Sequence, residues 1–118
     1  MGGNNNIYKN KKKFKDKYTI TEKYAENLTM DDLKILKGSP DCLYSDCEGC
    51  LYSFFNTDIG KYVLNNVRFI VNEMDGFTKG RDIDNNLRDI WMKNGFQKIG
   101  TGYGCGTSCD TEIWYKNN

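Results

Sequence analysis

Two short acidic segments hold the residues best suited to chemistry. Residues 46–49 read Asp-Cys-Glu-Gly and follow a brief apolar run at 42–44, while residues 73–76 read Glu-Met-Asp-Gly and follow a longer run at 67–71. In open α/β sheets, ligands bind beyond the carboxyl ends of the strands. Parallel neighbouring strands would therefore gather four carboxylates at one rim: Asp46, Glu48, Glu73 and Asp75.

Carboxylates crowded at one rim raise one another's pKa and favour a shared proton or a bound cation. The sequence contains no His, which is the commonest general base and metal ligand, so acid–base chemistry would rely on residues such as these. The alternative is that acids at strand ends only cap the helices that follow. Spacing alone leaves both interpretations open.

The cysteines offer a second kind of chemistry. There are five: Cys42, Cys47, Cys50, Cys105 and Cys109. An odd number without a secretion signal predicts reduced thiols rather than a disulfide framework. The last four leave open a zinc-stabilised binding module, because four thiolates can hold Zn²⁺ in a tetrahedron, or a redox pair at the start of a helix. Buried or incidental thiols are the simpler interpretation, and we predict no metal site.

Charge is distributed unevenly around a net value of +1. Residues 1–18 contain six Lys and one Asp, whereas the remaining residues contain 11 Lys and Arg against 15 acids. We expect 1–17 to form a disordered basic tail, followed by one domain at 18–118. The tail has few aromatics of the kind that stack bases, so nucleic acid is not an expected partner. No apolar run approaches the roughly 20 residues that cross a bilayer, which predicts a cytoplasmic protein without membrane contact.

Hydrophobic periodicity and breakers indicate the elements that must position these residues. Helices are expected at 30–37, from 49, from 58 and from Asp82 or Asp84 to Gly95; strands are expected at 18–27, 41–45, 67–71, 96–101 and 111–116. The glycine-rich segment 100–106 leads to a strand rather than a helix, so it predicts a hairpin loop and not a phosphate-binding loop.

Alternating strands and helices predict a mostly parallel sheet with right-handed crossovers, closed by an antiparallel C-terminal strand pair. This ending is similar to the C-terminal edge of a class I methyltransferase sheet. The predicted fold class is therefore α/β, a partial Rossmann-like three-layer sandwich with a short sheet. The strand at 41–45 would leave an open apolar edge, which predicts a homo-oligomer, a partner chain or pairing with 18–27.

Several segments together carry a resemblance to a known family. They are Thr-Met-Asp-Asp-Leu at 29–33, Leu-Tyr-Ser-Asp-Cys-Glu-Gly at 43–49, Ile-Val-Asn-Glu at 70–73 and, more loosely, Asn-Gly-Phe at 94–96. In order and spacing, roughly residues 28–116 resemble the C-terminal half of the FkbM-type S-adenosylmethionine-dependent methyltransferases. The family's Asp, Glu and Gly fall on Asp46, Glu48 and Gly49, and its later Glu falls on Glu73.

The sequence also departs from the family's pattern. Tyr44 stands where the family usually has Lys, and Leu51 stands where it usually has a second Glu. No strand, glycine-rich turn and helix of the kind that holds the cofactor precede residue 28. The resemblance therefore covers a truncated methyltransferase-like domain.

For function, the resemblance implies methyl transfer from S-adenosylmethionine, to oxygen if the domain is active, with a small-molecule or glycan acceptor. It implies Asp46, Glu48 and Glu73 as the catalytic residues, which would orient the substrate, and it assigns no cofactor-binding residue. The alternative is a non-catalytic remnant that serves as an interaction or structural module.

Overall fold

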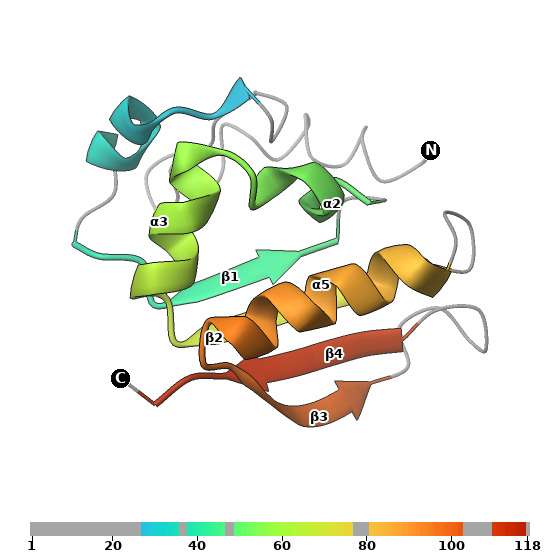
Figure 1. Ribbon diagram of the computed structural model, residues 1–118. Coiled ribbons are helices and arrows are strands. Elements are labelled where there is room, and N and C mark those ends of the chain that lie inside the picture. The colour runs from blue at the N-terminus through green and yellow to red at the C-terminus, as the bar shows by residue number, and fades with distance from the viewer. Residues whose placement is uncertain (1–26, 36–37, 47–48, 77–80, 103–109, 118) are drawn as a thin grey trace, which may run out of the picture.

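The computed structural model describes residues 27–35, 38–46, 49–76, 81–102 and 110–117 (Figure 1). In chain order the elements are η2 (Met30–Ile35), β1 (Cys42–Ser45), α2 (Leu51–Phe54), α3 (Asp58–Asn66), β2 (Phe69–Met74), α5 (Arg81–Lys93), β3 (Gln97–Gly102) and β4 (Asp110–Tyr115). The tail predicted at 1–17 and most of the strand predicted at 18–27 lie outside the described residues.

The strands form one mixed sheet in the order β1-β2-β4-β3. β1 and β2 are parallel, and β4 is antiparallel to both β2 and β3. β1, β2 and β3 therefore run in the same direction, while β4 turns back and fills the space between β2 and β3. The predicted antiparallel closing pair is confirmed, and the insertion of β4 beside β2 is a long-range pairing that the sequence pattern did not predict.

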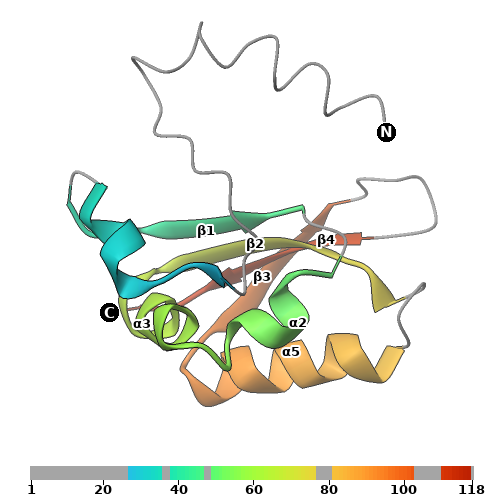
Figure 2. The same cartoon turned by 90° about the horizontal axis from the view of Figure 1, so that it is seen from above.

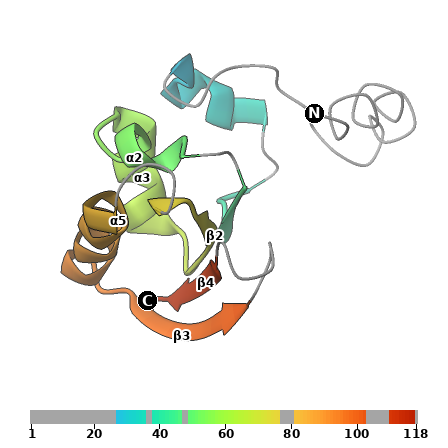
Figure 3. The same cartoon turned by 90° about the vertical axis from the view of Figure 1, so that its right-hand side faces the viewer.

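The helices α2, α3 and α5 all lie on one face of this sheet (Figures 2 and 3). Right-handed crossovers that move along a sheet in one direction place their helices on the same side. Both crossovers, from β1 to β2 and from β2 to β3, move in that way. The described residues thus form two layers, not the three that the sequence predicted.

The hydrophobic core lies between the helices and the covered face of the sheet. Trp91 on α5 and Ile70 on β2 are both 0% exposed. The Trp91 ring contacts Trp114 at a centroid distance of 5.3 Å and Phe55, edge to face, at 6.3 Å. Aromatic side chains of this kind bury large areas, so this cluster dominates the packing of helix against sheet.

Local signals account for several element boundaries. The Thr57 hydroxyl accepts a hydrogen bond from the Gly60 N–H at 3.1 Å and caps α3. Gly95, at a φ of 91°, ends α5 as predicted. Val67 was expected to begin a strand, but its N–H donates to the Val63 carbonyl and closes α3, so β2 begins only at Phe69.

The helix predicted at 30–37 is a 3₁₀ helix ending at Ile35. At its start, the Asp32 carboxylate accepts hydrogen bonds from the Thr29 N–H at 2.7 Å and hydroxyl at 3.2 Å. The Asp32 carboxylate in the first turn therefore satisfies the N–H and hydroxyl of the residue that precedes the helix. Within the described ranges, no helix is long and apolar enough to cross a membrane.

Candidate functional site

Asp46 and Glu73 both follow the last registered pair of the parallel strands. Ser45, the last residue of β1, pairs with Asn72 of β2, and Asp46 and Glu73 are the next residues along the two segments. Ser45 and Asn72 are buried and face the helices. Successive side chains of a strand alternate between the faces, so Glu73 within β2 belongs to the face without helices. Asp46 is exposed and Glu73 is half-buried.

The other two acids of the predicted carboxylate rim are Glu48 and Asp75. Glu48 lies outside the described residues, so its position is not part of the site geometry. Asp75 is buried, and its backbone makes a hydrogen bond with the Tyr52 hydroxyl on the helix side.

A second polar cluster surrounds Tyr52. Its hydroxyl donates to Asp84 Oδ1 at 2.8 Å. Burial, followed by the Asp84 carboxylate, raises the pKa of Tyr52 above its ordinary value. Asp84 is only 1% exposed, and its Oδ2 has no hydrogen-bond partner within the described part of the chain. Gly76 packs directly on this carboxylate, because a Cβ there would stand 1.9 Å from Oδ2.

A third cluster centres on Glu112 of β4, which is 2% exposed. Arg88 Nε donates to both carboxylate oxygens at 3.1 Å and Arg88 Nη2 donates to Oε2 at 2.5 Å. Trp114 Nε1 donates to Oε1 at 3.0 Å, and Lys98 Nζ lies 3.6 Å from Oε2. Burial alone would raise the pKa of Glu112, but these donors and cations hold it below its ordinary value. The group therefore stays charged and binds α5 to the sheet.

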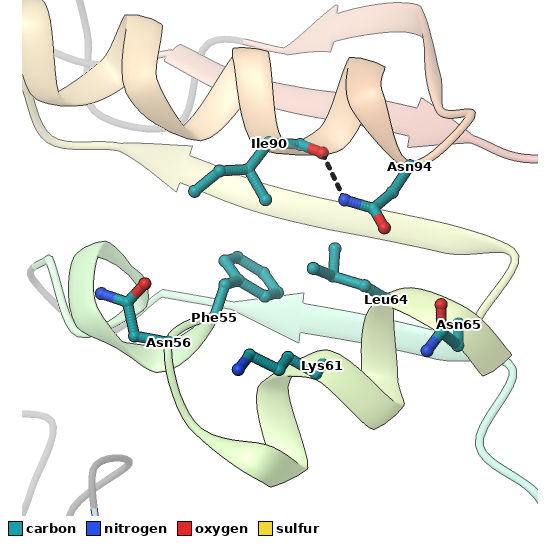
Figure 4. A pocket seen from close by; sticks show the side chains of 7 residues that line it. All are labelled: Phe55, Asn56, Lys61, Leu64, Asn65, Ile90 and Asn94. Atoms are coloured by element: carbon teal, nitrogen blue, oxygen red, sulfur yellow. Dashed lines mark hydrogen bonds between the residues drawn. The ribbon is translucent and has the colours of Figure 1, made fainter.

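An open cavity of about 350 Å³ lies between α3 and α5 (Figure 4). Its lining residues are Phe55, Asn56, Lys61, Leu64, Asn65, Ile90 and Asn94. The Asn94 side chain donates to the Ile90 carbonyl at 2.8 Å, which leaves its amide oxygen toward the cavity. None of the acids at the carboxyl edge of the sheet contributes to it, so the cavity is separate from Asp46 and Glu73.

The state of Cys50 corrects the prediction that all the cysteines are reduced thiols. Cys50 is disulfide-bonded, which contradicts the expectation of reduced thiols throughout. Cys42 is free and exposed. A disulfide sulfur has no thiolate to offer a zinc ion, so Cys50 leaves the proposed set of four ligands. In the parts of the chain described above, no group of three or more His, Cys, Asp or Glu is placed to hold a metal ion.

The sequence analysis did not identify the buried clusters around Tyr52 and Glu112, although the sequence contains a signal for the second. Glu112 occupies the same face of β4 as Trp114, two positions away, so an alternating strand pattern puts an acid among core residues. Such an acid requires a partner, and Arg88 is the nearest base on the amphipathic helix. Asp84 was interpreted only as a helix cap, because its contact with Tyr52 spans 32 positions.

Comparison with known proteins identifies no relative of this chain. No family model matches this chain, and no curated protein or solved structure is significantly similar to it. The functional argument therefore rests on the residues and their placement.

Proposed function

We propose that this chain carries the C-terminal half of an FkbM-type methyltransferase domain, with S-adenosylmethionine as the methyl donor and a hydroxyl oxygen as the acceptor. The observation that supports the proposal is the sheet order β1-β2-β4-β3, in which β4 alone is antiparallel. Class I methyltransferase sheets end in the same way at their C-terminal edge. The resemblance of 28–116 to the FkbM pattern points to the same family.

Asp46 and Glu73 have the chemistry that such a site needs from this half. Both follow the last registered pair of the parallel strands β1 and β2, toward the carboxyl ends of those strands. Carboxylates there can accept hydrogen bonds from the hydroxyl of a small molecule or glycan and can take up its proton. S-adenosylmethionine, when bound, would supply an electrophilic methyl group. Among the described residues we assign none to holding it, and Glu48 joins the proposal by resemblance alone.

A second function is favoured by a separate observation. The described helices cover one face of the sheet (Figure 3). Register and alternation place the partly buried side chains of Val71, Ile113 and Tyr115 on the other face. Proteins expose contiguous apolar surface mainly where something binds. The alternative is therefore a non-catalytic module that acts through this face.

Calorimetric titration of the purified chain with S-adenosylhomocysteine distinguishes the two functions. Saturable binding at micromolar concentration supports the methyltransferase proposal. The variants Asp46→Asn and Glu73→Gln should then bind the product form unchanged and lose methyl transfer by at least about tenfold. Asp89→Asn, at an exposed acid on α5, is the matched control and should change neither. Absence of heat with a sample shown to be folded by circular dichroism would favour the interaction module.

A further inference from the structure

The cavity between α3 and α5 combines an apolar floor with a polar border (Figure 4). Phe55 and Leu64 are buried and Ile90 is half-buried, and these three side chains converge on the floor. The volume of about 350 Å³ lies at the lower end of the range of roughly 300–1,000 Å³ that is typical of small-molecule sites. The cavity therefore fits a ligand with a small apolar body.

The border of the cavity is rich in hydrogen-bond donors. Within the described residues, no hydrogen bond or ion pair engages the side chains of Lys61, Asn56 or Asn65. The ammonium of Lys61 offers three donors, and each of the two carboxamides offers two donors besides its oxygen. Asn94 differs, because its amide nitrogen already donates to the Ile90 carbonyl. The border favours a ligand whose head group is rich in acceptors.

Lys61 is the only charged residue among the described residues that line the cavity. The other charges on the C-terminal half of α5 offset one another. Arg88 is bound to Glu112, and Asp89 and Lys93 stand four residues apart on the helix, a spacing at which opposite charges interact.

The other charges near α3 are offset by the ends of that helix. Asp58 lies in the first turn, beside the positive end of the helix dipole. Lys116 Nζ donates to the Leu64 carbonyl in the last turn, at the negative end. Asp58 and Lys61 form no ion pair with each other in the described structure. The Lys61 ammonium is therefore the charge that remains for a ligand, and it matches a head group with one negative charge.

We propose that this cavity binds a small monocarboxylate with an apolar body. Lys61 pairs with the carboxylate, the free carboxamides of the border add hydrogen bonds, and the body packs on the apolar floor. A phosphate ester fits less well, because it carries nearly two negative charges and the helix ends at the cavity are C-terminal ends, which do not attract anions. This inference goes beyond the proposed function: the cavity is separate from Asp46 and Glu73, so either proposal can fail without the other.

Titration of the full chain with phenylacetate, followed residue by residue with heteronuclear NMR, tests the proposal. The expected result is a saturable shift of the backbone and side-chain amides that line the cavity, with a dissociation constant on the order of 1 mM for so small a ligand. Phenylacetamide has the same apolar body without the charge. It should bind about three- to fivefold more weakly, because it loses the pairing with the exposed Lys61 ammonium.

Two variants with the same change in net charge identify the residue responsible. Lys61→Gln should abolish the preference for phenylacetate and leave the affinity for phenylacetamide unchanged. Lys34→Gln, at an exposed lysine of η2 that does not line the cavity, should keep the preference of the parent. Both lysines are exposed, so both variants should fold as the parent does.

Three results overturn the proposal. The first is a parent chain that binds the acid and the amide equally. The second is a preference for the acid that survives Lys61→Gln. The third is the absence of saturable shifts at the lining residues with either compound at about 20 mM, which is well above the expected dissociation constant.

Discussion

Glu112 forms a largely buried ion pair with Arg88. Its carboxylate is 2% exposed, and Arg88, whose side chain is 31% exposed, supplies the charge that offsets burial. Lys34 and Asp31 also form an ion pair at 2.9 Å, but those side chains are 78% and 82% exposed. Desolvation makes the first pair costly to break, whereas water screens the second.

Glu112→Gln should lower the free energy of unfolding by about 2–3 kcal/mol, because it leaves the Arg88 guanidinium without its counter-charge at a partly buried position. Asp31→Asn removes the exposed pair and should cost less than about 0.5 kcal/mol. Urea denaturation of the two variants and the parent measures both values. Equal losses would mean that Glu112 contributes no more than a surface charge.

The raised pKa of Tyr52 predicts a loss of folding stability at alkaline pH. Its pKa is raised in the folded state above the ordinary value of 10.0, so folding disfavours the phenolate. The contribution is therefore fully present below pH 10 and is lost as the pH rises above it. Urea midpoints between pH 8 and 11 should fall for the parent and stay flatter for Tyr52→Phe. At neutral pH the same variant should cost about 1–2 kcal/mol, because Asp84 loses its donor.

At the scale of elements, the end of α2 packs directly against the first turn of α3. The Phe54 carbonyl ends α2 and accepts hydrogen bonds from the Thr57 N–H at 3.1 Å and the Thr57 hydroxyl at 2.6 Å. Gly60, in the first turn of α3, packs on the same carbonyl. The absence of a side chain is what permits this approach, since the helix conformation itself would accept any residue.

Gly60→Ala should destabilise the fold by about 2–4 kcal/mol, because the new Cβ would stand 2.1 Å from Phe54 O, a backbone atom that cannot rotate away. Gly102→Ala on β3 is the control: the nearest atom outside its own chain neighbours lies 4.0 Å from the added Cβ, on Thr111. That change should stay within about 0.5 kcal/mol. Thermal unfolding of both variants decides whether the α2–α3 contact is as tight as the distances indicate.

At the scale of the whole molecule, stability should be graded across the sheet. β2 and β4 are central, each paired on both sides, whereas β1 and β3 are edges in the described structure. The core aromatic cluster also packs on the central strands. Amide hydrogen exchange should therefore be slowest in β2 and β4 and faster in β1. Equal protection of β1 and β2 would show that a further strand pairs with the β1 edge.

Much of the secondary structure could be predicted because its signals are local. Apolar spacing and Gly95 located α5, and the apolar runs located β1 and β4. Prediction failed at Val67, where an apolar residue closes a helix, since only the neighbouring turn distinguishes that role from a strand start. For the candidate site, the parallel pairing of β1 and β2 was predicted and is confirmed, whereas the contact of Asp75 with Tyr52 joins segments distant in sequence.

By itself, the sequence determined the α/β class and the antiparallel closing pair, because periodicity, breakers and loop length act over a few residues. Only the tertiary structure decided the insertion of β4 beside β2, the burial of Glu112 against Arg88, the disulfide at Cys50 and the placing of all the described α-helices on one face of the sheet. Each of these depends on contacts between segments distant in sequence, where the free energy is set by burial and pairing rather than by local preference.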